Sequence, residues 1–446
     1  MRGIMKINTN SHRQYRLFPL LGILLLVSLA CSASSLTDLL ERETPPTRMP
    51  VVTAAPTLPP QAADNVERQL EIFEDLWTVV NEEYVYQDFN GVDWAATKVE
   101  YQALIEAGLT ADEFYVTLDE MIFSLGDEHS VYLSPELVAE EDAEFAGAFE
   151  YVGIGVYMQA VPERERALVL LVFPGTPAEA AGLKSRDSVL LVDGEPAIGA
   201  DGFISEAIRG EAGSSVTLTV QTPGEEPREI IVSREALNVA TPVPYEVLTS
   251  PAGQRIGYVL FASFADSTVD EALGEALRAM TADGPLDGLI LDNRWNEGGY
   301  FDVLSNVLGY FMPDGTVGHF VSRYDQNEFD IRAEDINGSQ GLPLVVMVGP
   351  GTVSAGEIMG GVLADFDRAY VIGETTFGNV ESLSGYDFED GSRAWIARET
   401  FRAFNNPDAN WEDTGIIPDL TVTGNIDEFT LQDDPAVVAA LEYFDN

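Results

Sequence analysis

The stretch on which the fold depends is Gly349-Pro-Gly-Thr-Val-Ser-Ala-Gly-Glu-Ile-Met359. The apolar run 342–348 before it predicts a buried strand, and residues 358–366 after it have helical spacing. Ser354 therefore falls at a strand-to-helix turn. The first N–H groups of a helix have no intrahelical partner there, and they suit a nucleophile whose attack creates an oxyanion. The alternative is that Thr352 or Ser354 only caps the helix.

The length and net charge of the chain limit the classes of protein to which it can belong. The chain has 446 residues, of which 46% are hydrophobic, so it is long enough for two or three domains with buried cores. The net charge of -50 comes from 74 acidic and 24 basic residues. Such a chain is a poor match for nucleic acid or an anionic membrane, and we expect a solvated acidic surface.

The first 31 residues predict a signal peptide. Basic residues precede the apolar run 17–30, which is short for a membrane span, and Cys31 follows. A cysteine at this point resembles a bacterial lipoprotein box and implies a lipid anchor outside the cytoplasm, with cleavage near Ala33 and secretion as the alternative. One cysteine cannot form a disulfide within the chain. Residues 32–65 are rich in Pro and Thr and predict an extended linker.

After the linker, the spacing of apolar residues and the expected secondary structure change twice along the chain. Residues 66–149 carry apolar side chains at helical spacing and predict a small helical unit. Residues 150–235 predict short strands and turns, including a hairpin about the Pro223-Gly224 turn. In residues 236–446 strands alternate with helices, which predicts an α/β domain.

The middle unit resembles a PDZ domain. The matching residues are the loop Gly153, Ile154, Gly155 and Val156 and the run 177–194, in which Arg186-Asp187 replaces the usual Gly-Asp. The resemblance implies that N–H groups of this loop hold the C-terminal carboxylate of a peptide, which adds a strand to the sheet edge.

A serine nucleophile needs a base, and few residues can serve. The only lysines are Lys6, Lys98 and Lys184, so the α/β domain contains none and a serine-lysine dyad within it is excluded. After removal of the signal peptide, His129 and His319 remain. His319 lies in a predicted strand and His129 in a predicted loop, where a side chain can face a cleft.

Residues 66–424 resemble the C-terminal processing (tail-specific) family of serine peptidases. The resemblance rests on four motifs in order: Leu291-Asp-Asn-Arg-Trp-Asn-Glu-Gly-Gly299, Thr352-Val-Ser-Ala-Gly-Glu-Ile358, Gly373-Glu-Thr-Thr-Phe-Gly378 and Thr414-Gly-Ile-Ile-Pro-Asp419. It implies an α/β core like those of crotonase and Clp protease, with an N-terminal helical unit and an inserted PDZ-like domain. It also implies Ser354 as the nucleophile, with no cofactor and no metal.

One departure from the family changes the predicted mechanism. Members with a serine-lysine dyad have lysine where this chain has Asn379. The histidine-using branch, similar to the tricorn protease core, takes its base from an Asp-x-His-Ser/Thr motif before the PDZ domain. Residues 127–130 have this form, so the resemblance implies His129 as the base.

Two acids are candidates for orienting that base, and three backbone groups for binding the oxyanion. Glu357 lies one helical turn after Ser354, and Glu412 lies just before the last motif. We rank Glu357 first. The oxyanion would be bound by the N–H of Ala355 and by the backbone at Gly298 or Gly299.

The sequence thus predicts an exported serine endopeptidase that cleaves proteins captured by their unstructured C-terminal tails. The alternative, suggested by Asn379 and by the divergent residues around Trp295, is a PDZ-containing peptide-binding or scaffold protein without catalysis.

Overall fold

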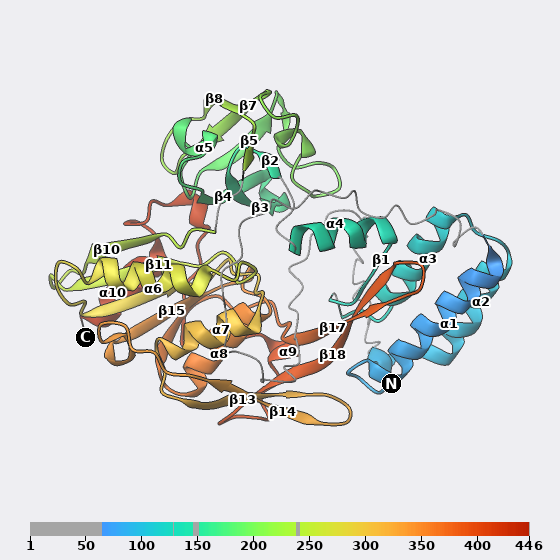
Figure 1. Cartoon of the computed structure of the whole chain (residues 1–446). Helices are drawn as coiled ribbons and strands as arrows, with labels where there is room; N and C mark the ends of the chain where they lie inside the picture. Colours follow the sequence, from blue (N-terminus) through green and yellow to red (C-terminus); the bar gives the residue numbers. More distant parts are fainter. Residues whose placement is uncertain (1–64, 128, 146–150, 238–240, 446) are drawn as a thin grey trace, which may run out of the picture.

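The computed structural model describes residues 65–127, 129–145, 151–237 and 241–445. The predicted signal peptide with Cys31, and the predicted linker as far as residue 64, lie outside these residues. Figure 1 shows three parts along the chain: a helical part, a β-rich part and a larger α/β part. Within the described ranges, no helix is both long enough and apolar enough to cross a membrane.

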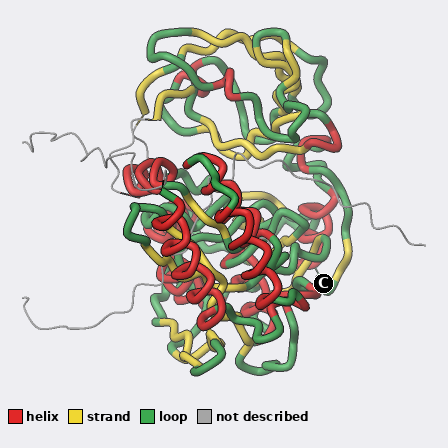
Figure 2. Tube along the Cα trace, turned by 90° about the vertical axis from the view of Figure 1, so that its right-hand side faces the viewer, coloured by secondary structure: helices red, strands yellow, loops and turns green. Residues whose placement is uncertain are grey.

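The helical part shares its hydrophobic core with the α/β part. Its elements are α1 (Val66–Glu83), η1 (Phe89–Gly91), α2 (Trp94–Glu106), α3 (Ala111–Phe123), β1 (Val131–Leu133) and α4 (Pro135–Phe145). Figure 2 shows helices of this part packed side by side below the β-rich part. Leu383, Ala394 and Trp395 of the α/β part belong to the same buried cluster as Phe73 and Leu118. The helices therefore pack onto strands that come almost three hundred residues later.

The β-rich part has a core of its own. Its elements are β2 (Tyr151–Gly153), β3 (Val156–Val161), η2 (Pro162–Arg164), β4 (Arg166–Val172), α5 (Pro177–Ala180), β5 (Ser188–Val192), β6 (Glu195–Pro196), η3 (Glu206–Ile208), β7 (Ser215–Gln221), β8 (Arg228–Ser233) and β9 (Glu235–Leu237). The strand order is β3-β4-β5-β7-β8, with every neighbouring pair antiparallel. The predicted hairpin around Pro223-Gly224 is present as β7 and β8.

The α/β part begins with the sheet that carries the nucleophile turn. Its first elements are β10 (Tyr245–Thr249), β11 (Arg255–Leu260), α6 (Val269–Met280), β12 (Gly288–Asp292), α7 (Phe301–Gly309), β13 (Gly315–Val321), β14 (Gln326–Ile331), η4 (Ser339–Gly341) and β15 (Leu344–Val348). The rest are α8 (Ala355–Asp365), β16 (Ala369–Gly373), β17 (Glu381–Asp387), β18 (Arg393–Ala403), α9 (Trp411–Thr414), β19 (Leu420–Thr421), η5 (Ile426–Glu428) and α10 (Pro435–Phe444). The main sheet has the order β10-β11-β12-β15-β16-β19 and is parallel from β11 onward.

Both faces of this sheet are covered, which explains why every residue of β12 and β15 is buried. Side chains of α6, α7 and α8 form one buried cluster with one face. The other face packs against α10 and against β4 of the β-rich part. The observed architecture is therefore the predicted α/β core with an N-terminal helical unit and an inserted PDZ-like domain.

A second sheet joins the helical part to the α/β part. Its order is β1-β18-β13-β14, and β17 pairs with β18. Val131, Tyr132 and Leu133 of β1 pair with Trp395, Ala394 and Arg393 of β18 (Figure 1). This pairing brings the loop that ends at Ser130 onto the α/β part.

Candidate active site

Ser354 lies between β15 and α8 in a strained backbone conformation. Its φ is 54° and its ψ is -126°, a region that residues other than glycine seldom adopt and that is enriched at functional sites. Among the described residues, its side chain forms no capping hydrogen bond to α8. Thr352 uses its hydroxyl to donate to the carbonyl of Asn293, at 2.7 Å. These contacts do not support the alternative in which either residue only caps the helix.

Gly298 lies directly against the nucleophile turn. A Cβ atom at this position would lie 2.7 Å from the Cβ of Ser354 and 2.9 Å from the nitrogen of Ala355, and the φ of 91° also favours glycine. The N–H of Gly298 donates to Oδ1 of Asn296, at 3.0 Å. The carbonyl of Asn296 accepts from the N–H of Val353, at 2.9 Å. The loop 292–299 is thereby fastened to the turn that carries Ser354.

Two other N–H groups remain candidates for binding an oxyanion. The N–H of Ala355 is the first of α8, so it has no intrahelical acceptor. Gly299 forms a parallel bridge with Phe264, in which the carbonyl of Gly298 and the N–H of Tyr300 make the hydrogen bonds. The N–H of Gly299 therefore points to the opposite side of the strand, because successive backbone groups alternate in direction.

The loop that carries His129 is closed by the carboxylate of Asp127. This carboxylate accepts from the N–H groups of His129 and Ser130, at 3.0 and 2.8 Å, and from the hydroxyl of Ser130, at 2.6 Å. The hydroxyl oxygen of Ser130 in turn accepts from the N–H of Ala397 in β18, at 3.0 Å. The Asp-x-His-Ser motif thus builds a turn and attaches that turn to the α/β part.

Asn379 contacts both the histidine loop and the nucleophile. Its carbonyl accepts from the N–H of Ser354, at 2.9 Å, and its Nδ2 donates to the carbonyl of Asp127, at 3.4 Å. The turn of Ser354 and the loop that carries His129, which are more than two hundred residues apart in sequence, therefore both contact one residue.

Glu357, which we ranked first as the orienting acid, makes its hydrogen bonds to a neighbouring loop. Its carboxylate accepts from the N–H groups of Gly378 and Asn379, at 2.8 and 2.7 Å, and from the hydroxyl of Thr376. Burial raises the pKa of Glu357 to about 7, although these hydrogen bonds act in the opposite direction. The carboxylate thus holds the loop 376–379 against α8.

Glu381 is the carboxylate beside the imidazole, and sequence reasoning missed it. Its Oε2 lies 3.6 Å from Nδ1 of His129, and its side chain is fully buried. Burial raises the pKa of Glu381, and the negative charge of Asp127 raises it further. Glu412 accepts from the N–H of Val380, at 2.7 Å, and burial and the charge of Glu381 raise its pKa as well. The histidine thus lies near two acids, of which Glu381 is fully buried and the nearer, and Glu412 is half-buried.

His319 lies at the far end of the nucleophile helix. Its ring stacks on Phe404, and Phe404 stacks on Phe366, which directly follows α8. The 11 residues of α8 span about 16 Å. This arrangement separates His319 from Ser354 by roughly the length of the helix.

The predicted peptide-binding loop packs tightly on α5. The carbonyl of Ile154 accepts from the N–H of Ala178, at 2.8 Å, and a Cβ atom on Gly155 would lie 2.3 Å from the side chain of Thr176. Gly153 pairs with Glu235. Val156 begins β3, which is an edge strand of the sheet. The loop therefore adjoins a strand edge that no other strand of the described residues pairs with, as peptide capture by strand addition requires.

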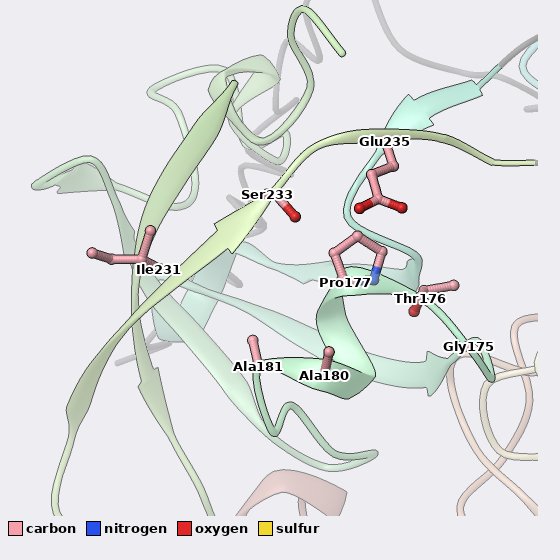
Figure 3. A pocket seen from close by; sticks show the side chains of 8 residues that line it. All are labelled: Gly175, Thr176, Pro177, Ala180, Ala181, Ile231, Ser233 and Glu235. Carbon is pink, nitrogen blue, oxygen red and sulfur yellow. The ribbon is translucent and has the colours of Figure 1, made fainter. Parts of the chain in front are cut away.

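A separate pocket of this part does not include the four loop residues. It is lined by Gly175, Thr176, Pro177, Ala180, Ala181, Ile231, Ser233 and Glu235. Figure 3 shows the carboxylate of Glu235 above Pro177 and Thr176. A peptide carboxylate would be repelled there, so this pocket does not suit the C-terminus of a peptide.

The β-rich part makes polar contacts with the loop that carries Gly298. The hydroxyl of Tyr157 in β3 donates to Glu297, at 2.6 Å. Arg186, which has a φ of 76°, donates to Asp434, at 2.9 Å, and Arg294 donates to the same carboxylate oxygen, at 2.7 Å. The departure Arg186-Asp187 thus places a buried arginine at the junction of two domains.

Comparisons with known proteins agree with this architecture. Residues 255–422 match the profile of Peptidase family S41, residues 66–123 match the Tricorn protease C1 domain, and residues 168–222 match the PDZ domain. A carboxyl-terminal-processing protease of Picosynechococcus is 31% identical over 350 residues, 78% of this chain and 81% of the relative. A protein of the same name from Synechocystis is 29% identical over 384 residues, 85% of this chain and 86% of the relative. The solved structure of a photosystem II D1 C-terminal processing protease aligns with a TM-score of 0.56 and 26% identity, covering 79% of this chain and 92% of that one.

Proposed function

Because the chain belongs to peptidase family S41, the carboxyl-terminal-processing proteases, and is a serine-type peptidase, we propose that it is an exported endopeptidase that cleaves proteins held by their unstructured C-terminal tails. The observation that supports this proposal best is the meeting of the Ser354 turn and the His129 loop at Asn379.

In the proposed reaction, His129 removes the proton of the Ser354 hydroxyl while the hydroxyl oxygen attacks the peptide carbonyl. Glu381, 3.6 Å from Nδ1, stabilises the imidazolium that forms. The N–H groups of Ala355 and Gly299 bind the developing oxyanion, and Gly298 lets the loop approach without a side chain. Glu357 and Glu412 hold the loop 376–380 in place through its backbone N–H groups.

Substrate capture is assigned to the PDZ-like domain. The loop Gly153–Val156 binds the terminal carboxylate of an unfolded tail, and the tail adds a strand at the free edge of β3. Export follows from the N-terminal apolar run and from Cys31, which would carry a lipid anchor on the outer face of the cell membrane. Secretion after cleavage near Ala33 is the other possible outcome of the same signal.

Labelling with a fluorophosphonate probe tests the catalytic part of the proposal. The wild-type protein is expected to be labelled and to cleave a peptide with a free C-terminus, whereas Ser354→Ala is expected to do neither. Absence of labelling in the wild type, or equal labelling of both proteins, would contradict it. A peptide that binds in fluorescence anisotropy but stays intact by mass spectrometry would instead support the scaffold alternative.

A further inference from the structure

Asn379 connects three elements of the site through three hydrogen bonds. Its carbonyl accepts from Ser354 and its N–H donates to Glu357, at 2.9 and 2.7 Å. Both of these bonds use the backbone, so any residue except proline could make them at this position. Only the third bond, from Nδ2 to the carbonyl of Asp127 at 3.4 Å, depends on the side chain.

The third bond acts on the loop that presents the imidazole. Asp127 holds His129 and Ser130 through its carboxylate, and Asn379 holds the carbonyl of the same residue from the side of the nucleophile. Ala397 fixes this loop to β18 at Ser130. Without the Asn379 amide, the loop keeps its attachment to β18 but loses its side-chain attachment to the loop 376–379 beside Ser354.

The other end of the Asn379 amide is unused. The side chain is 2% exposed, and its Oδ1 has no hydrogen-bond partner among the described residues. A buried amide that serves only the fold is normally satisfied at both ends, and an exception at an active site calls for a functional explanation.

We propose that Asn379 is a positioning residue of the peptidase reaction, whose side-chain N–H holds the His129 loop at a fixed place relative to Ser354. This inference rests on the proposed function. In serine-lysine members of the family, the residue at this position is itself the base. Here it would instead hold the loop that carries the base.

The test compares Asn379→Leu, which has a similar volume and no amide, with the wild type. We expect kcat to fall by up to about 100-fold while KM changes by less than about twofold, because a misplaced base slows chemistry more than binding. The acid limb of the profile of kcat/KM against pH is expected to move to lower pH, since an imidazolium that leaves Glu381 loses its stabilising charge. Asp127, Glu381 and Glu412 are the charged groups that bear on this limb.

Three further measurements make the result decisive. Asn327→Leu, which removes an exposed amide on β14 bonded to Glu399, is expected to leave kcat and the acid limb unchanged. If Asn379→Leu does not fold by circular dichroism, Asn379→Ala removes the same donor and takes its place. An unchanged kcat, or a lower kcat with an unmoved acid limb, overturns the proposal. If the wild type itself is not labelled by the fluorophosphonate, the proposed function fails, which is a separate outcome.

Discussion

The nucleophile and its proposed base are placed in different ways. Ser354 follows β15 and begins α8 within one continuous stretch, and its strained backbone is held by the adjacent loop 292–299. His129 lies in a short loop of the helical part, and this loop is held against the α/β part by the pairing of β1 with β18 and by the contact of Asn379 with Asp127. Local chain geometry is sufficient to place the first residue, whereas the second depends on contacts made far along the chain.

Because of this difference, we expect that a substitution can impair the Ser354 turn or the His129 loop without impairing the other. Substitutions near Ser354 affect the nucleophile and the oxyanion donors. If His129 is the base, substitutions near it are expected to leave the nucleophile in its strained turn and to change only how its proton is removed. Measurements that separate these effects test whether the base truly comes from the helical part.

The largest effect on activity is expected when each histidine is replaced in turn. His129→Ala is expected to lower kcat/KM by about 10²- to 10⁴-fold, the usual contribution of a general base. His319→Ala is expected to keep most of the activity, because its ring stacks on Phe404 at the other end of α8. Steady-state kinetics on a peptide substrate measures both. The opposite ranking would move the base to the α/β part.

The second test compares two buried glutamates. Glu381→Gln is expected to lower kcat by about 10- to 100-fold, because a hydrogen bond or close contact to a charged group is worth about 1.5–3 kcal/mol. Glu357→Gln removes acceptors from the loop 376–379 and is expected to lower the free energy of unfolding by about 1–3 kcal/mol. Kinetics and urea unfolding of both variants separate the two roles. If Glu357→Gln alone changed the pH profile, Glu357 would be the orienting acid.

The smallest expected effect is on stability as a function of pH. Burial raises the pKa of Glu357 from 4.5 to about 7, so the folded state binds this proton more tightly than the unfolded state. The stabilisation is present below pH 4.5 and is lost as the pH rises through 7. The free energy of unfolding is expected to fall over this range by at most about 1.4 kcal/mol per pH unit for this group. Urea unfolding from pH 5 to 8 measures the slope, and Glu357→Gln should have a flatter one. An equal slope in both proteins would assign the pH dependence to other groups.

The sequence was informative wherever the evidence lay within one short stretch. The strand-turn-helix at Ser354 and the β7–β8 hairpin are present as predicted. The absence of lysine from the α/β domain pointed to a histidine base, and that role is still a prediction that the kinetic test decides.

Contacts between distant residues were the part that could not be predicted. Glu381 is separated from His129 by about 250 positions, and among 74 acidic residues no spacing marks it as a partner. Glu357 has favourable helical spacing from Ser354, but its carboxylate turns to the loop 376–379. The pairing of β1 with β18 was not foreseen either, because a three-residue strand has too little pattern to show its partner.

The pairing of β1 with β18 also imposes an order on how the site is assembled during synthesis. The helices that precede His129 emerge first, but the strand that receives β1 ends at Ala403, about 270 residues later. A growing chain that stops before β18 includes Ser354 but lacks the strand with which β1 pairs. Such a chain is expected to be inert toward its own exposed segments. Late completion of one sheet would thus delay proteolytic activity until nearly the whole protein has been made.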